Sequence, residues 1–551
     1  MKILILGGYG VFGGRLVRLL ADLNGLELLI CGRNLAAAQA FCDTTPCAPR
    51  LRPLRVDRTA IASVLDSERP DLVVDASGPF QDYGDHGYNV IEACIAARIP
   101  YLDFADGADF VSGVSRYDAA ARAAGIFVLA GLSSFPVLTA AVVREMGRTM
   151  ELVSVDGGIA PSPHAGIGLN VMRAVVGYAG SPVKLQRGGR PGRGTGLAES
   201  RRFTVAVPGK LPLRNVHFSL VDVPDLQVLP AEHPTLTDVW MGAGPVPEVL
   251  HRVLNGLAKA RARFRLPSMV PLAPLFYTVL NLMKFGEHRG GMFVRAQGIR
   301  NGEPMELTWH LLAEGDDGPY IPSMAIEAVI RQLLAGERPA DGARPATRAL
   351  ELDQYVALFA GRSIHTGFRR EEAGAALYLQ LLGSAFDVLP PQVQALHRGS
   401  EARRWSGRAD VRRGTGLMAR AIAAMIGFPK AGNDVPVTVQ FTPENGGERW
   451  TREFGGRRFS SLQWRGQGRN AYLLMERFGV MDVAMALVVE GERLQLVARR
   501  WSLFGVPMPG FLLPRGTAFE TETDGMFVFD VEIAAPFVGM IVGYRGRLMP
   551  E

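Results

Sequence analysis

The N-terminus constrains this chain most, because a glycine-rich turn stands directly between an apolar strand and a helix. Residues 3–6 are apolar, the spacing G-x-G-x-x-G follows, and a helix-compatible run begins at residue 15. In this context the first glycine makes a tight turn, the second lets the backbone approach a pyrophosphate, and the third lets the helix pack on the strand. The turn therefore predicts a dinucleotide site, and its expected contacts are Gly7, Gly8, Gly10, Val11, Phe12 and Gly13.

Arg33 bears on which dinucleotide is expected. Residues 27–31 predict the second strand, and Arg33 follows it twenty residues after Gly13. NAD sites place an acid at this distance, on the ribose 2′-hydroxyl. A guanidinium instead pairs with a 2′-phosphate, which an acid would repel. We therefore expect NADP(H) as the preferred cofactor, with Arg33 and Asn34 as contacts. NAD(H), and an Arg33 that is merely solvated, stay open as alternatives.

Strands and helices alternate through the first 130 residues. Further strands are expected at residues 52–56, 72–75, 101–104 and 126–130, and helices at residues 86–97 and 115–124. This alternation predicts an α/β fold with a doubly wound parallel sheet, covered on both faces, as in a Rossmann domain. Ligands bind outside the carboxyl ends of such strands. The turns at these ends add further expected cofactor contacts: Asp57, Ser77, Gly78, Pro79 and Phe80.

Candidate catalytic residues follow from the same geometry. A nicotinamide cofactor supplies the redox step, while the protein orients the substrate and provides a proton. Tyr83 and Asp103 lie near expected strand ends, and His164 lies in a Pro-Ser-Pro-His loop beside the expected cleft. His86 and Asp106 are further candidates near the strand ends. For each of them, hydrogen bonding in a turn, helix capping or a solvated loop stays open as the alternative.

Several motifs together resemble those of saccharopine-dehydrogenase-like oxidoreductases. They are Gly-Tyr-Gly-Val-Phe-Gly at residues 8–13, Ala-Ser-Gly-Pro-Phe at 76–80 with Tyr-Gly at 83–84, Tyr-Leu-Asp-Phe-Ala-Asp-Gly at 101–107 and Gly-Leu-Ser-Ser-Phe-Pro at 131–136. The resemblance extends to about residue 365, with matching residues at 318–322 and 336–343. It implies a Rossmann domain, an inserted α+β domain, a nicotinamide cofactor and a small-molecule substrate. Many such relatives look like reductases of unassigned or lipid-related substrates rather than enzymes of lysine metabolism.

Three domains are expected: a Rossmann domain at residues 1–135, an inserted α+β domain at 136–365, and a β-rich domain at 370–551. The inserted domain is expected to serve catalysis or dimerisation, with helices that return to the Rossmann unit; a homodimer stays open. Asn301-Gly302 between two apolar runs predicts a hairpin with a type I′ turn. An amphipathic helix is expected at residues 323–334. Residues 336–347 are expected to form a linker or covering loop.

Residues 266–283 form an uncharged segment, and its length is near the lower limit for a membrane span. Pro267, Pro271 and Pro274 interrupt the segment, so helix is expected only over residues 275–283. A buried core helix, an interfacial or substrate-lining helix and a true span are the three interpretations. Cationic residues flank the segment and would suit a peripheral contact with anionic headgroups: Arg261, Arg263, Arg265 and Lys284.

The C-terminal region predicts a mainly antiparallel β domain of short successive strands. In residues 526–533 apolar and acidic side chains alternate, as in a half-buried strand. The region also resembles a domain of unknown function often fused behind saccharopine-dehydrogenase-like proteins, through Trp405-Ser-Gly, Trp450-Thr-Arg452, Phe459-Ser-Ser, Glu476-Arg477 and Tyr544-Arg-Gly546. No activity comes with that resemblance. A curved sheet could enclose a hydrophobic ligand or be filled by its own side chains.

Composition narrows the function classes. The net charge of +6 over 551 residues is a weak bias, and no nucleic-acid-binding motif is present. The four cysteines fit neither a zinc site nor a disulfide framework, so no metal is expected. The chain begins with its first strand, and few cysteines suit a reducing compartment, so a cytoplasmic location is expected.

Two functions are consistent with these observations. The first is an NADP(H)-dependent oxidoreductase that acts on an unidentified, hydrophobic small molecule. The second is a non-catalytic nucleotide-binding protein, whose C-terminal β domain binds a lipid-like ligand or a partner. An open pocket above the nicotinamide would favour the enzyme, and a pocket blocked by side chains would favour the binding protein.

Overall fold

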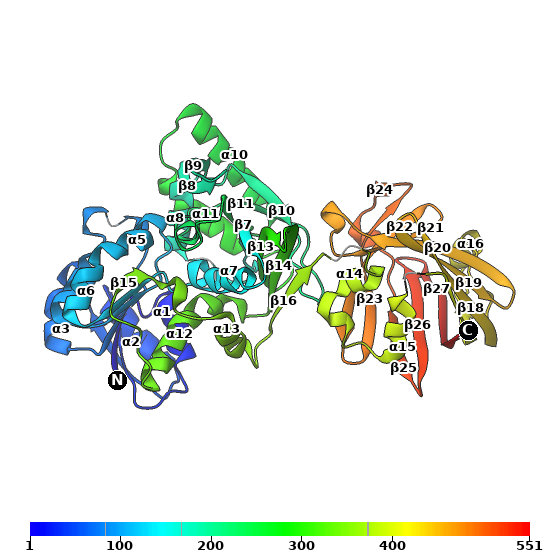
Figure 1. Cartoon of the computed structure of the whole chain (residues 1–551), viewed down its shortest axis with the longest axis horizontal. Helices are drawn as coiled ribbons and strands as arrows, with labels where there is room; N and C mark the ends of the chain where they lie inside the picture. Colours follow the sequence, from blue (N-terminus) through cyan, green and yellow to red (C-terminus); the bar gives the residue numbers. More distant parts are fainter. Residues whose placement is uncertain (83, 167, 372–373, 400) are drawn as a thin grey trace. The chain divides into compact units, whose positions relative to one another are not determined.

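The computed structural model describes residues 1–82, 84–166, 168–371, 374–399 and 401–551 (Figure 1). The chain divides into two compact units. The first contains Met1–Phe203 and Val216–His365, and the second contains Thr204–Asn215 and Thr366–Glu551. A short segment in the middle of the first unit therefore belongs to the second.

The first unit begins with a parallel sheet, which has seven strands in the described part of the chain, in the order β15-β6-β5-β4-β1-β2-β3. Its central strands are almost wholly buried, as a sheet with both faces covered requires. This confirms the predicted doubly wound Rossmann fold. The strands are β1 (Lys2–Leu6), β2 (Glu27–Gly32), β3 (Arg50–Arg55), β4 (Leu72–Asp75), β5 (Tyr101–Asp103), β6 (Phe127–Ala130) and β15 (Gly342–Pro345).

Helices cover this sheet. Alternate residues of β1, β2 and β4 pack with α3, α4 and α6 in one buried cluster, while α1 and α12 pack side by side (Figure 1). The predicted amphipathic helix at residues 323–334 is α12, which is buried over most of residues 321–330. The helices are α1 (Val11–Leu19), α2 (Leu35–Thr44), α3 (Ile61–Glu68), α4 (Asn89–Ala97), α5 (Ala108–Gly113), α6 (Asp118–Ala124), α7 (Thr139–Gly147), α12 (Ile321–Leu334) and α13 (Leu352–Phe359).

The expectation of a linker at residues 336–347 is wrong in its middle. Gly342–Pro345 forms β15 and pairs in parallel with β6. The backbone N–H of Ala343 also donates to the Asp118 carboxylate at 3.0 Å. This stretch of four residues is too short to show the periodicity of a strand, and prolines lie in and near it. It becomes a strand because it pairs with β6, more than 200 residues earlier.

The inserted part of the first unit is built on a second, mixed sheet, as the predicted α+β domain requires. Its described strands follow the order β10-β11-β12-β7-β13-β14-β16, and only β12 and β7 among the registered pairs are parallel. The predicted hairpin is β13–β14, with positive φ at Asn301 and Gly302. The strands are β7 (Glu151–Ala160), β10 (Ser200–Phe203), β11 (Val216–Leu220), β12 (Asp238–Ala243), β13 (Arg289–Arg300), β14 (Glu303–Glu314) and β16 (Ile364–Arg370), beside a hairpin of β8 (Pro182–Arg187) and β9 (Arg190–Thr195).

The uncharged segment at residues 266–283 forms helix α11 (Ala273–Leu282) after its prolines. Only Ala273 of α11 is fully buried, and Leu282 is 77% exposed, so the interpretation as a buried core helix is wrong. Within the described residues, no helix is long and apolar enough to cross a membrane. The other helices of this part are α8 (Leu169–Tyr178), α9 (Asp225–Glu232) and α10 (Glu248–Phe264).

The second unit contains a closed antiparallel barrel of ten strands, counted over the described residues. Each strand pairs with the next, and β27 pairs with β17 to close the ring, while β23 and β25 are joined by a short pairing. The predicted mainly antiparallel domain is confirmed. The ring contains β17 (Arg403–Arg413), β18 (Gly432–Glu444), β19 (Gly447–Phe454), β20 (Arg457–Arg465), β21 (Leu474–Phe478), β22 (Met481–Glu490), β23 (Arg493–Leu503), β25 (Ala518–Thr523), β26 (Met526–Ala535) and β27 (Gly539–Pro550).

Short elements complete the second unit. A two-residue strand, β24 (Val506–Pro507), extends β23 by a hairpin. Two helices precede the barrel, α14 (Leu377–Leu382) and α15 (Pro391–Arg398), and α15 packs on β25 and β26. One helix, α16 (Leu417–Ile426), connects β17 to β18 and packs on β27.

Candidate active site

A cleft of about 810 Å³, here called the nucleotide cleft, lies at the carboxyl ends of β1, β2 and β4. This is where a doubly wound sheet binds its ligands. Most of the expected cofactor contacts line it: Gly7, Gly10, Val11, Phe12, Arg33, Asp57, Ser77, Gly78, Pro79 and Phe80. The remaining three, Gly8, Gly13 and Asn34, are not among the lining residues.

The glycines of the loop have different surroundings. A Cβ on Gly13 would overlap the Gly7 carbonyl and the Gly8 Cα, so Gly13 allows α1 to pack on the loop. A Cβ on Gly8 would lie 3.0 Å from the Ile5 carbonyl oxygen, against β1. A Cβ on Gly10 would lie 3.0 Å from the Gly7 carbonyl oxygen and meet little else. Gly10 therefore leaves room for a phosphate at the start of α1, where N–H groups and the helix dipole favour an anion.

Arg33 is exposed at the end of β2 and lines the nucleotide cleft. Asp57, after the neighbouring strand β3, also lines the cleft, and the Thr59 N–H and hydroxyl donate to it at 3.0 and 2.7 Å. These hydrogen bonds hold the pKa of Asp57 below its usual value, and the charges of Arg33 and Arg55 add to them. Asn34 caps α2 by accepting from the Ala37 N–H at 3.1 Å, so its side chain serves the helix.

The first turns of α8 form a further wall of the nucleotide cleft. Gly168, Asn170 and Arg173 line it, and the Asn170 amide donates to the Gly78 carbonyl at 2.7 Å. Sequence reasoning missed these residues, since α8 lies about ninety residues beyond the turn it contacts. Tyr9 and Arg58 also line the cleft and were missed.

A second cavity of about 540 Å³, the apolar cavity, adjoins the nucleotide cleft within the first unit. Its lining comes largely from apolar side chains of α8, α10, α11 and β13, such as Met172, Val175, Leu254, Val279 and Met292. The two spaces share the lining residues Val11, Phe12, Phe104, Asp106, Gly168 and Val171. A molecule in the apolar cavity therefore reaches the edge of the nucleotide cleft.

A few polar groups face the apolar cavity. Asp106 lies where the two spaces meet and accepts a hydrogen bond from Gln81 at 3.1 Å. Burial raises the pKa of Asp106. Burial also raises the pKa of Tyr178, and the charges of Asp106 and Asp222 raise it further. An Asp106 carboxyl with a raised pKa is able to hold a proton that it can transfer.

His251 lies in the wall of the apolar cavity on α10. Neither of its ring nitrogens has a hydrogen-bond partner among the residues that the structure describes. Burial lowers the pKa of His251 to about 4, and the neighbouring His217 contributes in the same direction. The imidazole is therefore neutral at pH 7 and offers one donor and one acceptor to the cavity.

The predicted catalytic residues do not meet at one place. Asp103 is fully buried, and its Oδ1 accepts from the Ala105 and Gly131 N–H groups at 2.9 and 2.7 Å. His164 is half-buried and packs on His288, with 4.6 Å between ring centroids. In the described part of the chain, neither Asp103 nor His164 belongs to the lining of the two spaces. Tyr83 lies outside the described residues.

No group of three or more His, Cys, Asp or Glu side chains within the described ranges could hold a metal ion.

Comparison with known families supports this architecture. Residues 3–129 match the saccharopine dehydrogenase NADP-binding domain. This match supports an NAD(P)-dependent oxidoreductase, with NADP(H) as the cofactor of the N-terminal domain. More particularly, the chain carries a saccharopine dehydrogenase NADP-binding domain at its N-terminus and the domain of unknown function DUF4166 at residues 389–548. Both resemblances predicted from the motifs are confirmed.

Three solved structures illustrate the structural similarity. Saccharopine dehydrogenase (L-Glu forming) from Saccharomyces cerevisiae is 14% identical, with a TM-score of 0.48, over 67% of this chain and 100% of that one. Amine dehydrogenase from Mycobacterium smegmatis is 12% identical, with a TM-score of 0.33, over 64% and 96%. The WlbA dehydrogenase from Thermus thermophilus, in complex with NAD and α-ketoglutarate, is 12% identical, with a TM-score of 0.28, over 65% and 94%. No curated protein matches the chain.

Proposed function

We propose that this protein is an NADP(H)-dependent oxidoreductase whose substrate is a hydrophobic small molecule held in the apolar cavity. The observation that carries the proposal is the junction between the two spaces. Hydride transfer requires the reacting atoms to lie about 3–3.5 Å apart. A cavity that shares Phe12, Phe104 and Asp106 with the nucleotide cleft supports that contact. Its apolar lining favours a substrate with little charge.

The residues of the nucleotide cleft fit NADP(H). Gly10 leaves space at the N-terminus of α1 for the pyrophosphate, and Arg33 offers a guanidinium to the 2′-phosphate at the position where NAD sites have an acid. When bound, the nicotinamide supplies or accepts the hydride. The first unit binds the cofactor, excludes water with the apolar cavity and provides the proton.

Asp106 is the proton donor in this proposal, because it stands at the junction and its pKa is raised by burial. His251 orients the substrate through a hydrogen bond from its imidazole, which has no hydrogen-bond partner among the described residues. Tyr83, Asp103 and His164 stay predictions as catalytic residues. The open junction supports the enzyme over the non-catalytic binding protein.

The substrate reaches the apolar cavity from a lipid surface in this proposal. Leu275 and Val279 of α11 line the cavity, while Leu282 and Phe285 at its end are exposed beside Lys284. Phe264 and Val249 of α10 are exposed as well. Apolar and cationic residues together favour peripheral contact with anionic headgroups. Dimerisation of the chain stays a prediction.

The test compares Asp106→Asn with wild-type protein. NADPH oxidation is measured with a lipid extract as the source of substrate, and NADPH binding is titrated separately. We expect Asp106→Asn to lower the turnover at least 100-fold and to leave NADPH affinity within about threefold, because general-acid catalysis typically contributes 10²–10⁴-fold. Asp66→Asn, an exposed residue of the same unit, is the matched control. Unchanged turnover in Asp106→Asn would contradict the proposed role of Asp106 as the proton donor.

A further inference from the structure

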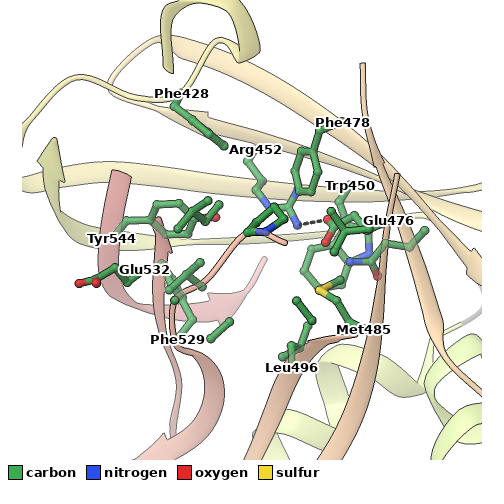
Figure 2. A pocket seen from close by; sticks show the side chains of 18 of the residues that line it. Phe428, Trp450, Arg452, Glu476, Phe478, Met485, Leu496, Phe529, Glu532 and Tyr544 are labelled. Atoms are coloured by element: carbon green, nitrogen blue, oxygen red, sulfur yellow. Dashed lines mark hydrogen bonds and ion pairs between the residues drawn. The ribbon is translucent and has the colours of Figure 1, made fainter. Parts of the chain in front are cut away.

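The interior of the barrel in the second unit is hollow. A cavity of about 310 Å³, here called the barrel cavity, runs among side chains that point inward from the strands (Figure 2). Closed barrels with more than eight strands have room for a ligand between their side chains. The volume is at the lower end of the range of small-molecule pockets. Most of the wall is apolar, as Phe454, Met485, Leu496 and Phe529 illustrate.

One side of the barrel cavity is polar. The Arg452 guanidinium donates to Glu476 Oε1 at 3.1 Å and to the Ser461 hydroxyl at 2.7 Å, and Ser461 donates to the same Oε1 at 2.6 Å. The side chains of Arg452 and Glu476 are 11% and 7% exposed. Figure 2 shows this pair at the cavity beside Trp450, over whose ring the guanidinium lies at 4.8 Å. Both members of the pair line the cavity, so a ligand there meets a donor and an acceptor together.

Other polar side chains that line the barrel cavity are also paired. The Tyr378 hydroxyl donates to Gln463 at 3.1 Å, and His397 contacts Glu520 at 2.5 Å. Among the described lining residues, the one further cation is Arg515, which is exposed on the loop between β23 and β25. No buried cation of the described lining is therefore left without an acidic partner. A carboxylate bound deep in the cavity would add a second negative charge beside Arg452, which Glu476 already neutralises, and such a charge is costly in a buried site.

Exposed apolar side chains gather in the connections at one end of the barrel. In an up-and-down barrel alternate connections share an end, so the connections after β17, β19, β21, β23 and β26 lie together. These connections carry exposed apolar side chains, including Leu417, Met425, Phe504 and Phe537, of which Phe537 is 92% exposed. Helix α16 belongs to this end, and its Ile422 and Ile426 line the cavity. The charged residues within these connections are all basic: Arg420, Lys430 and Arg515.

We propose that the barrel cavity binds a neutral amphiphile, an apolar chain with one hydroxyl-type head group, in a site separate from the nucleotide cleft and the apolar cavity. The head group donates a hydrogen bond to Glu476 and accepts one from Arg452. The chain lies along the apolar wall and enters past α16. The Arg452–Glu476 pair sets the preference for a neutral head group over a carboxylate.

The test is equilibrium dialysis of the full-length protein with radiolabelled 1-decanol and decanoate at pH 8. We expect decanol to bind at least tenfold more tightly than decanoate. Glu476→Gln removes the competing carboxylate and frees Arg452. It should therefore lower the ratio of the decanol affinity to the decanoate affinity at least tenfold, or reverse the preference. Glu453→Gln changes an acid of β19 whose side chain is 41% exposed; it is the matched control and should leave the ratio unchanged. A preference for decanoate in the wild-type protein, or an unchanged ratio in Glu476→Gln, overturns the proposal.

Two cavity-filling variants locate the bound decanol. Ala498→Trp fills the barrel cavity and Val175→Trp fills the apolar cavity of the first unit. Loss of the tight decanol site in Ala498→Trp and its retention in Val175→Trp support the barrel. The opposite pattern overturns the barrel site and leaves the proposed oxidoreductase standing. If Ala498→Trp does not fold, the change of ratio in the isosteric Glu476→Gln decides the proposal.

Discussion

Asp103 is the last residue of β5 and Asp106 follows three residues later, yet their surroundings differ. Asp103 is fully buried and accepts two backbone hydrogen bonds, whereas Asp106 faces both the nucleotide cleft and the apolar cavity. A strand-end position predicts nearness to the ligand. The direction of each side chain depends on the turn that follows, which the sequence pattern does not define. The motif therefore predicted the neighbourhood of the proposed proton donor and not its identity.

The cofactor contacts were more predictable, because a local strand–turn–helix motif defines most of them. Arg33 and the glycine loop line the nucleotide cleft at the positions that the spacing indicated. Tyr178 and His251 could not be found in this way. They come from α8 and α10, and only the packing of those helices against the Rossmann unit brings them to the apolar cavity.

Arg33→Ser should weaken NADPH binding and leave NADH binding nearly unchanged. The loss of one charge-assisted pair with the 2′-phosphate costs roughly 1–3 kcal/mol. Arg50→Ser, exposed at the opposite end of the same sheet, should change neither affinity. Fluorescence titration with both dinucleotides measures the effect. Equal weakening of NADPH and NADH would contradict contact between Arg33 and the phosphate.

Asp103 should make the stability of the first unit depend on pH. Burial raises its pKa to about 7 in the folded chain, against about 3.9 in an unfolded chain. Between these values the folded state holds the proton more tightly, so this group's contribution to stability falls as pH rises from about 4 to 7 and is constant above. Asp103→Asn cannot lose a proton.

The measurement for Asp103 is urea unfolding at pH 5 and pH 8. From pH 5 to pH 8, the free energy of unfolding should fall more in the wild-type protein than in Asp103→Asn. The same difference in both proteins would show that Asp103 does not titrate in this range.

At the scale of elements, local turns were predictable and long-range pairings were not. The β13–β14 hairpin follows from Asn301-Gly302, since both residues have positive φ as a type I′ turn requires. Strand β15 and the closure of the barrel between β17 and β27 join segments more than 100 residues apart. Such pairings leave no mark in the periodicity of either segment.

The glycine loop provides a prediction with an internal control. Gly10→Ala should keep the fold and weaken NADPH binding, because its Cβ meets little besides the Gly7 carbonyl and points toward the space for the phosphate. Gly13→Ala should lose both stability and binding, because its Cβ overlaps the Gly7 and Gly8 backbone. Circular dichroism melting and NADPH titration measure the two effects. Equal melting temperatures for both variants would contradict these roles.

At the scale of the whole chain, the second unit includes a segment that sequence reasoning placed in the inserted domain. Within Thr204–Asn215, the Gly209 carbonyl accepts from the Val489 N–H at 2.8 Å and the Ala206 carbonyl accepts from Arg369 at 2.5 Å. Leu211 also packs against a buried cluster of the barrel strands. Local patterns could not show that these residues serve a sheet that forms more than 150 residues later.

Residues 366–551 alone should therefore fold as a cooperative unit of reduced stability. A synthetic peptide of residues 204–215 added in excess should raise the melting temperature, because it restores these contacts. A peptide of the same composition in scrambled order is the control. Absence of cooperative unfolding, or equal stabilisation by both peptides, would contradict the division into these two units.

The central claim is that hydride passes between NADP(H) in the nucleotide cleft and a hydrophobic molecule in the adjoining apolar cavity. Its most direct test is incubation of the protein with NADPH deuterated at the transferable position and a lipid extract, followed by mass spectrometry of organic and aqueous fractions. Deuterium should enter a product in the organic fraction. Val175→Trp, which fills the apolar cavity, should reduce this label at least tenfold while NADPH still binds. Label confined to a water-soluble product, or undiminished in Val175→Trp, would contradict the account.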